Sequence, residues 1–120
     1  MATNANAYFE RGLAFKVEGR YDEAVVEFQQ LLVEEPNSCD GRYQLGLVYG
    51  FTGLFDESLD ELRRASVLAP ARIDVRLDLA LTFTMLGMYD EAKVEFEEIL
   101  RREPNNKRAL ESLSFITQPS

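Results

Sequence analysis

The sequence predicts an all-α protein, a short solenoid of three two-helix repeats followed by one further helix. Three observations predict this fold. Residue classes recur at a step of about 34 residues, glycine and proline occupy the same places in each step, and apolar residues follow helical spacing. Alternation with a period of two is absent, so we expect no β-sheet. Two helices per repeat and one at the end give about seven helices.

The repeat is carried by six places that keep their residue class in three tandem copies. In order, these are Gly12, Gly19, Tyr21, Ala24, Phe28 and Pro36; then Gly46, Gly53, Phe55, Ser58, Leu62 and Pro70; then Ala80, Gly87, Tyr89, Ala92, Phe96 and Pro104. The three repeats therefore cover 5–38, 39–72 and 73–106. A chain of 120 residues fits one domain, which we place at 1–120.

Each copy contains signals that begin and end two helices. In the first copy a helix is expected over 5–18, and it ends at Gly19 because glycine accepts positive φ. The second helix is expected to begin at Asp22, whose carboxylate would cap the first free amides, and to stop before Pro36. The later copies repeat these signals, with first helices over 39–52 and 73–86.

Small residues in mid-helix predict close packing within each helix pair, with larger side chains filling the space alongside. The predicted core consists of Tyr8, Phe15, Phe28, Leu45, Tyr49, Leu62, Leu79, Phe83 and Phe96. Beyond the repeats, a helix over about 107–116 is expected to cover the last repeat, with Leu110 and Leu113 facing inward.

This pattern resembles the tetratricopeptide repeat (TPR) family, whose helix–turn–helix unit has about 34 residues. The resemblance extends over 5–106 and implies a right-handed α-α superhelix in which the first helix of each pair lines a concave surface. The chain departs from the family pattern where a large aromatic residue is expected, since Arg42 and Arg76 stand there. It also carries Arg11 where the later copies have leucine.

Composition excludes several classes of function. A net charge of −8 disfavours nucleic acid and anionic membranes and favours basic partners. The chain has no histidine, so the commonest general base and metal ligand are missing, and we predict neither an enzyme nor a metal or cofactor site. Its lone thiol, Cys39, is expected to be inert. No secretory signal and no apolar run of membrane-spanning length are visible, so we predict a cytoplasmic protein without membrane insertion.

The candidate binding site is an apolar column along the first helices, which we call the apolar column. It takes the fifth, ninth and thirteenth residues of each repeat: Phe9, Leu13, Val17, Tyr43, Leu47, Phe51, Leu77, Leu81 and Met85. A spacing of four keeps each trio on one helix face, which differs from the face assigned to the core. The ninth and thirteenth places are polar in many similar repeats but apolar here, so this column points to a binding groove.

Acidic residues flank this column and form its predicted edge, at Glu10, Asp40, Asp74 and Asp78. A groove with an apolar floor and an acidic edge suits a protein or peptide partner with Leu or Phe anchors and flanking Lys or Arg. An amphipathic helix or an extended peptide has this chemistry. The chain is therefore predicted to be a protein-interaction module or scaffold.

Three alternatives remain open from the sequence. Part of the column could be core between neighbouring first helices. The same face could be the interface of a homo-oligomer, since a large apolar patch is rarely left in water. Architecture alone also suggests a small chaperone of the secretion type, which would hold apolar client segments.

Some similar domains hold the C-terminal carboxylate of heat-shock chaperones with Lys, Arg and Asn. The corresponding places here are Phe9, Leu13, Gln44, Asp74 and Asp78. Two aspartates would repel a carboxylate, so we expect no binding of this kind.

Overall fold

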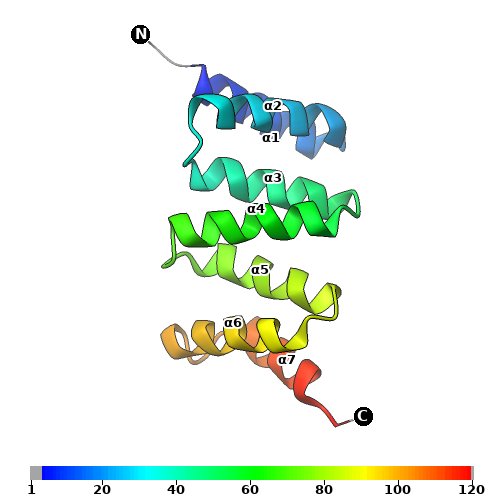
Figure 1. Ribbon diagram of the computed structural model, residues 1–120, viewed down its shortest axis with the longest axis vertical. Helices are drawn as coiled ribbons and strands as arrows, with labels where there is room; N and C mark the ends of the chain where they lie inside the picture. The colour runs from blue at the N-terminus through cyan, green and yellow to red at the C-terminus, as the bar shows by residue number, and fades with distance from the viewer. Residues whose placement is uncertain (1–3, 120) are drawn as a thin grey trace. The chain divides into compact units, whose positions relative to one another are not determined.

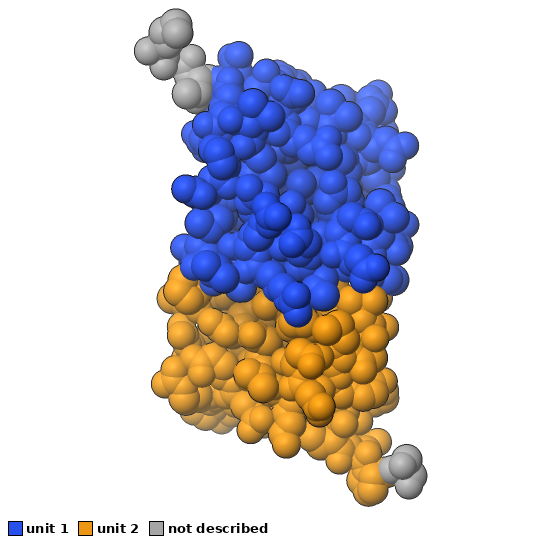
Figure 2. All heavy atoms as spheres, in the orientation of Figure 1, with its two compact units in different colours: residues 1–69 blue, residues 70–120 orange. Residues whose placement is uncertain are grey.

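The structure is a computed structural model that describes residues 4–119. Every regular element in this range is an α-helix, which confirms the predicted all-α class. The chain divides into two compact units, 1–69 and 70–120 (Figure 2). The first unit holds α1 (Ala5–Val17), α2 (Tyr21–Glu34), α3 (Cys39–Phe51) and α4 (Phe55–Leu68). The second unit holds α5 (Ile73–Met85), α6 (Tyr89–Arg102) and α7 (Lys107–Thr117).

Within each unit the helices pack as pairs (Figure 1). In the first unit α1 packs on α2 and α3 on α4, while α2 also contacts α3. Its core includes the fully buried Phe28 and Val48. In the second unit α5 packs on α6, and α6 packs on α7, with Phe96 and Ile99 fully buried.

The turns inside the pairs end the first helices as predicted. Gly19, Gly53 and Gly87 follow the first helices and have φ of 75°, 81° and 74°. This left-handed conformation costs glycine little because it has no Cβ.

The predicted N-terminal cap of the second helices was wrong. The helices begin one residue earlier than expected, at Tyr21 in the first pair. The side chain of the N-cap residue, Arg20, does not cap the helix amides but donates a hydrogen bond to the Glu23 carboxylate at 2.8 Å. Asp22 and Glu23 instead lie in the first turn, where the helix dipole favours negative charge. Side-chain caps occur elsewhere: the Ser38 hydroxyl accepts from the Gly41 amide at 3.0 Å.

Most of the predicted core is buried. Of its nine residues, Tyr8, Phe15 and Tyr49 are half-buried and the other six are buried. The inward face of α7 differs from the prediction, because Ala109 is fully buried whereas Leu110 is 47% exposed. Helical phase explains this error, since a helix that turns Ala109 inward brings Leu113 to the same side and rotates Leu110 away.

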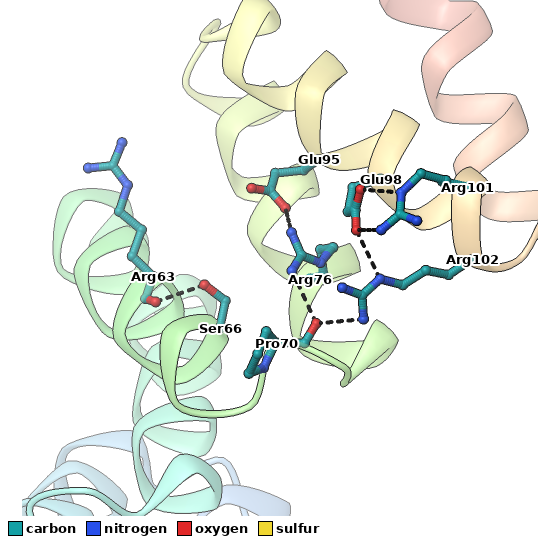
Figure 3. Close-up of polar contacts among 8 residues, drawn as sticks. All are labelled: Arg63, Ser66, Pro70, Arg76, Glu95, Glu98, Arg101 and Arg102. Atoms are coloured by element: carbon teal, nitrogen blue, oxygen red, sulfur yellow. Dashed lines mark hydrogen bonds and ion pairs between the residues drawn. The ribbon is translucent and has the colours of Figure 1, made fainter.

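The arginines that replace the family aromatic form largely buried ion pairs with the second helix. Arg42 Nη1 lies 2.9 Å from Glu61 Oε2, and its Nε donates to the Pro36 carbonyl at 3.0 Å. Arg76 repeats this arrangement in the second unit, with Glu95 at 2.7 Å and the Pro70 carbonyl at 3.1 Å (Figure 3). Each arginine therefore joins both helices of its pair to the preceding loop.

Close packing in the first pair predicts a large difference between two glycines. A Cβ added to Gly12 would lie 2.5 Å from the fully buried Phe28 ring, whereas at Gly50 its nearest neighbour is Ser58 Oγ at 3.4 Å. Gly12→Ala should therefore lower the free energy of unfolding by about 1–3 kcal/mol. Gly50→Ala, the matched control, should leave it unchanged or raise it by up to about 1 kcal/mol. Chemical denaturation of both variants checks this; equal effects would contradict it.

The buried ion pairs predict a second contrast. Arg42→Ala leaves Glu61 with a largely buried, unpaired carboxylate, so the free energy of unfolding should fall by about 2–3 kcal/mol. Arg11→Ala removes the pair with Glu27, in which the arginine side chain is 51% exposed and screened by water, and should cost less than about 1 kcal/mol. Urea unfolding of the two variants measures both losses, and a loss at Arg42 no larger than that at Arg11 would refute the structural role.

Candidate functional site

The apolar column in the first unit is partly exposed along its whole length. Phe9 and Leu13 on α1 and Tyr43 and Leu47 on α3 are half-buried. The last member of each trio is open to solvent: Val17 is 87% exposed and Phe51 is 57% exposed. Each of these six positions therefore presents apolar surface from a helix that is anchored in the unit.

Part of the column also packs against the core. Phe9 and Leu13 contact the buried cluster that includes Phe28, and the Phe9 ring centre lies 6.0 Å from that of Phe28 at an interplanar angle of 60°. Phe9 and Leu13 therefore contribute to the core, and the Phe9 ring does so through a contact with α2. Such anchoring holds the exposed side in a fixed position.

A cleft of about 350 Å³ lies at the N-terminal ends of α1 and α3. It brings Phe9 of the column together with Asp40 of the predicted acidic edge. Glu35 also lines it, from the residue that follows α2. Sequence reasoning missed Glu35, because no local pattern relates the end of α2 to the start of α1.

At the opposite end of the column lies a cation that sequence reasoning also missed. Lys16 Nζ donates to Gln44 Oε1 at 2.7 Å and lies 5.7 Å from the centre of the Phe51 ring. The position of Lys16 one helical turn after Leu13 could have indicated that it flanks the column. Its contact with α3 depends on packing between helices.

The predicted acidic edge therefore differs in charge along its length. Glu10 and Asp40 are exposed at the N-terminal end of the column in the first unit. Glu10 has no ion-pair partner within residues 4–119. Lys16 adds a positive charge at the other end, so the two ends of the column in this unit carry side chains of opposite charge.

In the second unit the three column residues lie on α5. Leu77 and Leu81 are half-buried, and Met85 is 63% exposed. Of the acidic residues, Asp78 is half-buried, and Asp74 accepts two hydrogen bonds from Arg72, at 2.8 and 3.2 Å. These hydrogen bonds hold the pKa of Asp74 below its ordinary value of 3.8, although partial burial opposes the shift.

Neither a metal centre nor a membrane span is present in the part of the chain that the structure describes. Within residues 4–119 no group of three or more His, Cys, Asp or Glu residues is arranged to hold a metal ion. No helix in that range has both the length and the apolar character needed to cross a membrane. The thiol of Cys39 is half-buried and lies 3.4 Å from the Ala65 carbonyl oxygen.

The paired helices and their regular recurrence along the chain define a helix-pair repeat protein. A family model described as tetratricopeptide repeat matches residues 6–38 and 74–106, which is more than half of the chain. The chain therefore belongs to the tetratricopeptide repeat family. A search of curated protein sequences gave no match.

Several solved structures share this fold. MamA is 22% identical with a TM-score of 0.89, over 94% of this chain and 66% of MamA. The first TPR of Spaghetti (RPAP3), bound to the HSP90 peptide SRMEEVD, is 23% identical with a TM-score of 0.89, over 96% of this chain and 91% of that one. The second TPR domain of human RPAP3, in complex with the HSP70 peptide SGPTIEEVD, is 25% identical with a TM-score of 0.87, covering 97% of both chains.

The pairing of Asp74 with Arg72 predicts a measurable titration. Because the hydrogen-bonded form is ionised, the folded-state pKa of Asp74 should lie below 3.8. Any stabilisation from the pair is present above that value and lost as the pH falls through the folded-state pKa. In Arg72→Gln the pKa should rise toward 3.8. NMR titration of the carboxyl group checks this, and an unchanged pKa in the variant would disprove the assigned cause.

Proposed function

We propose that this chain is a protein-interaction module that binds a peptide or an amphipathic helix on its apolar column. The observation that carries the proposal is that all nine column residues keep exposed surface while two of them, Phe9 and Leu13, also pack against the core. Anchored apolar side chains lose little conformational entropy on binding, so they suit recognition.

The comparisons support peptide binding as the general activity. The two RPAP3 domains share the fold and are described with chaperone peptides. At the places where some similar domains hold a chaperone carboxylate with Lys, Arg and Asn, this chain has Phe9, Leu13, Gln44, Asp74 and Asp78. We therefore propose a partner of different chemistry from an acidic chaperone tail.

The chemistry of the column defines the partner. Each large apolar side chain that becomes fully buried contributes about 1.5–3 kcal/mol before ordering costs. Leu or Phe anchors would contact the column, and a basic flank would lie near Glu10 and Asp40 at the cleft. Lys16 disfavours a basic flank at the other end. The exposed acids thus favour one orientation of a partner that has positive charge at one terminus.

Self-association through the same face is the second candidate function. It is favoured by the exposure of Val17, Phe51 and Met85 at equivalent places in the three repeats, because apolar patches on a monomer tend to be covered. The secretion-type chaperone rests on architecture alone and is a special case of the first proposal, with an unfolded client as the bound segment.

The proposal is tested with two variants that add the same charge. Phe51→Glu places a carboxylate in the column, and Val26→Glu places one on α2 at a residue of similar exposure, 54% against 57%. The probe is a synthetic amphipathic helix with Leu and Phe on one face and Lys on the other. Fluorescence anisotropy should show at least about tenfold weaker binding for Phe51→Glu and little change for Val26→Glu. Affinity should also fall with salt.

Other outcomes separate the alternatives. Equal binding by the two variants would remove the column as the binding site. Light scattering at several concentrations tests self-association, since an oligomer that Phe51→Glu dissociates would favour the second candidate. A monomer at every concentration would exclude it.

A further inference from the structure

The first unit contains a second cleft, outside the apolar column, with different chemistry. Its volume is about 420 Å³, and it lies between the loop after α2 and the last turns of α4. The lining residues are Pro36, Asn37, Arg42, Arg63, Arg64, Val67 and Leu68. We call this the basic cleft, because three arginines and no carboxylate line it in a chain of net charge −8.

Apolar surface accompanies this positive charge. Val67 is 79% exposed, and Leu68 beside it is also exposed. Arg42 is held by Glu61 and the Pro36 carbonyl, so it forms a fixed wall. Arg64 lies 3.3 Å from Asp60 in a solvent-exposed ion pair. Such pairs contribute little, so a second carboxylate can compete for that guanidinium.

At the equivalent place in the third repeat, arginines of α6 contact a carboxylate of the same helix and the preceding loop (Figure 3). There Arg102 donates to the Pro70 carbonyl at 3.2 Å and to Glu98 at 2.9 Å. Arg101 also donates to Glu98, and hydrogen bonds from the two arginines hold the pKa of Glu98 at about 2. The α6 side chains therefore form hydrogen bonds with one another and with the carbonyl group of the preceding loop.

One repeat earlier in the chain, the residues at the corresponding positions have different chemistry. Glu97 and Glu98 become Arg63 and Arg64, while Arg101 and Arg102 become Val67 and Leu68. Leucine cannot donate to the Pro36 carbonyl, which in the first unit accepts a side-chain hydrogen bond from Arg42. Where the third repeat has the hydrogen-bonded pair Glu98–Arg102, the second repeat therefore has an arginine and a leucine.

We propose that the basic cleft binds an acidic peptide segment in which an aliphatic side chain lies beside a carboxylate. The carboxylate pairs with Arg63 and Arg64, and the aliphatic side chain packs on Val67 and Leu68. Guanidinium groups bind carboxylates through paired hydrogen bonds, which makes arginine suited to this role. The proposal is independent of the function assigned to the apolar column.

The test uses an acetylated and amidated peptide with Glu-Leu-Glu at its centre, followed by NMR titration of the isotope-labelled protein. Shifts should concentrate at the amides of the basic cleft. Arg63→Gln/Arg64→Gln should weaken binding at least about tenfold. Lys107→Gln/Arg108→Gln removes the same charge from exposed residues of α7 and should change affinity less than about twofold. Gln-Leu-Gln and Glu-Ser-Glu peptides should both bind more weakly.

A second variant asks whether the third-repeat arrangement closes the cleft. Arg64→Glu/Leu68→Arg transplants the Glu98–Arg102 pair into the second repeat and should abolish binding while the helical circular dichroism stays unchanged. No shifts with the wild-type protein, or equal losses for the Arg63/Arg64 and Lys107/Arg108 variants, would overturn the proposal. Shifts confined to the apolar column would do the same, and would leave that column as the peptide site.

Discussion

The close approach of two helices at a residue with little or no side chain is the contact on which each repeat depends. In the first pair the Phe28 ring occupies the space that a side chain on Gly12 would need. In the second pair Leu62 Cγ would lie 3.0 Å from a Cβ on Gly46, and Ser58 adds a hydrogen bond to the Gly46 carbonyl at 2.7 Å. Ala80 holds the equivalent place in the third repeat and is fully buried. Because the three helix pairs pack in the same way, Gly12, Gly46 and Ala80 all lie at the close contact between the two helices of a pair.

This constraint also explains how the apolar column stays exposed. The face of α1 that carries Gly12 is used by the contact with α2, so the neighbouring face with Leu13 and Val17 is left partly open. The exposure increases toward the end of each first helix, where the glycine turn leads the chain away. The proposed binding surface and the core contact therefore lie on adjacent faces of one short helix.

The sequence predicted the features that depend on local geometry. Gly19, Gly53 and Gly87 have the conformation expected of them, and the helices begin and end within a few residues of their predicted limits. The prediction that Asp22 caps the second helix was wrong, because Tyr21 is already part of that helix and Arg20 is its N-cap residue. Leu110 was predicted to face inward because a shift of one residue along a short amphipathic helix is enough to change which side chains face the core.

Side-chain contacts between different helices could not be predicted from local sequence patterns. Lys16 and Gln44 lie far apart in the sequence, and their hydrogen bond follows from the packing of α1 beside α3. The paired roles of Arg42 and Glu61 likewise needed the structure, although both recur in the next repeat as Arg76 and Glu95. A comparison of charge pairs between repeats could have revealed this pattern. Whether the nine column residues bind a partner remains a prediction.

The half-buried Phe9 ring has a thermodynamic consequence. One side of this ring packs toward Phe28, and another borders an open cleft. A ligand that covers the open side binds only the native arrangement of α1 and α2, so occupancy and unfolding become linked equilibria. Substitutions of Phe9 would then affect both folding and ligand binding. A smaller side chain would weaken the native state, and a charged side chain would disfavour an apolar ligand. Sequence drift there should be slower than at residues that serve folding or recognition alone.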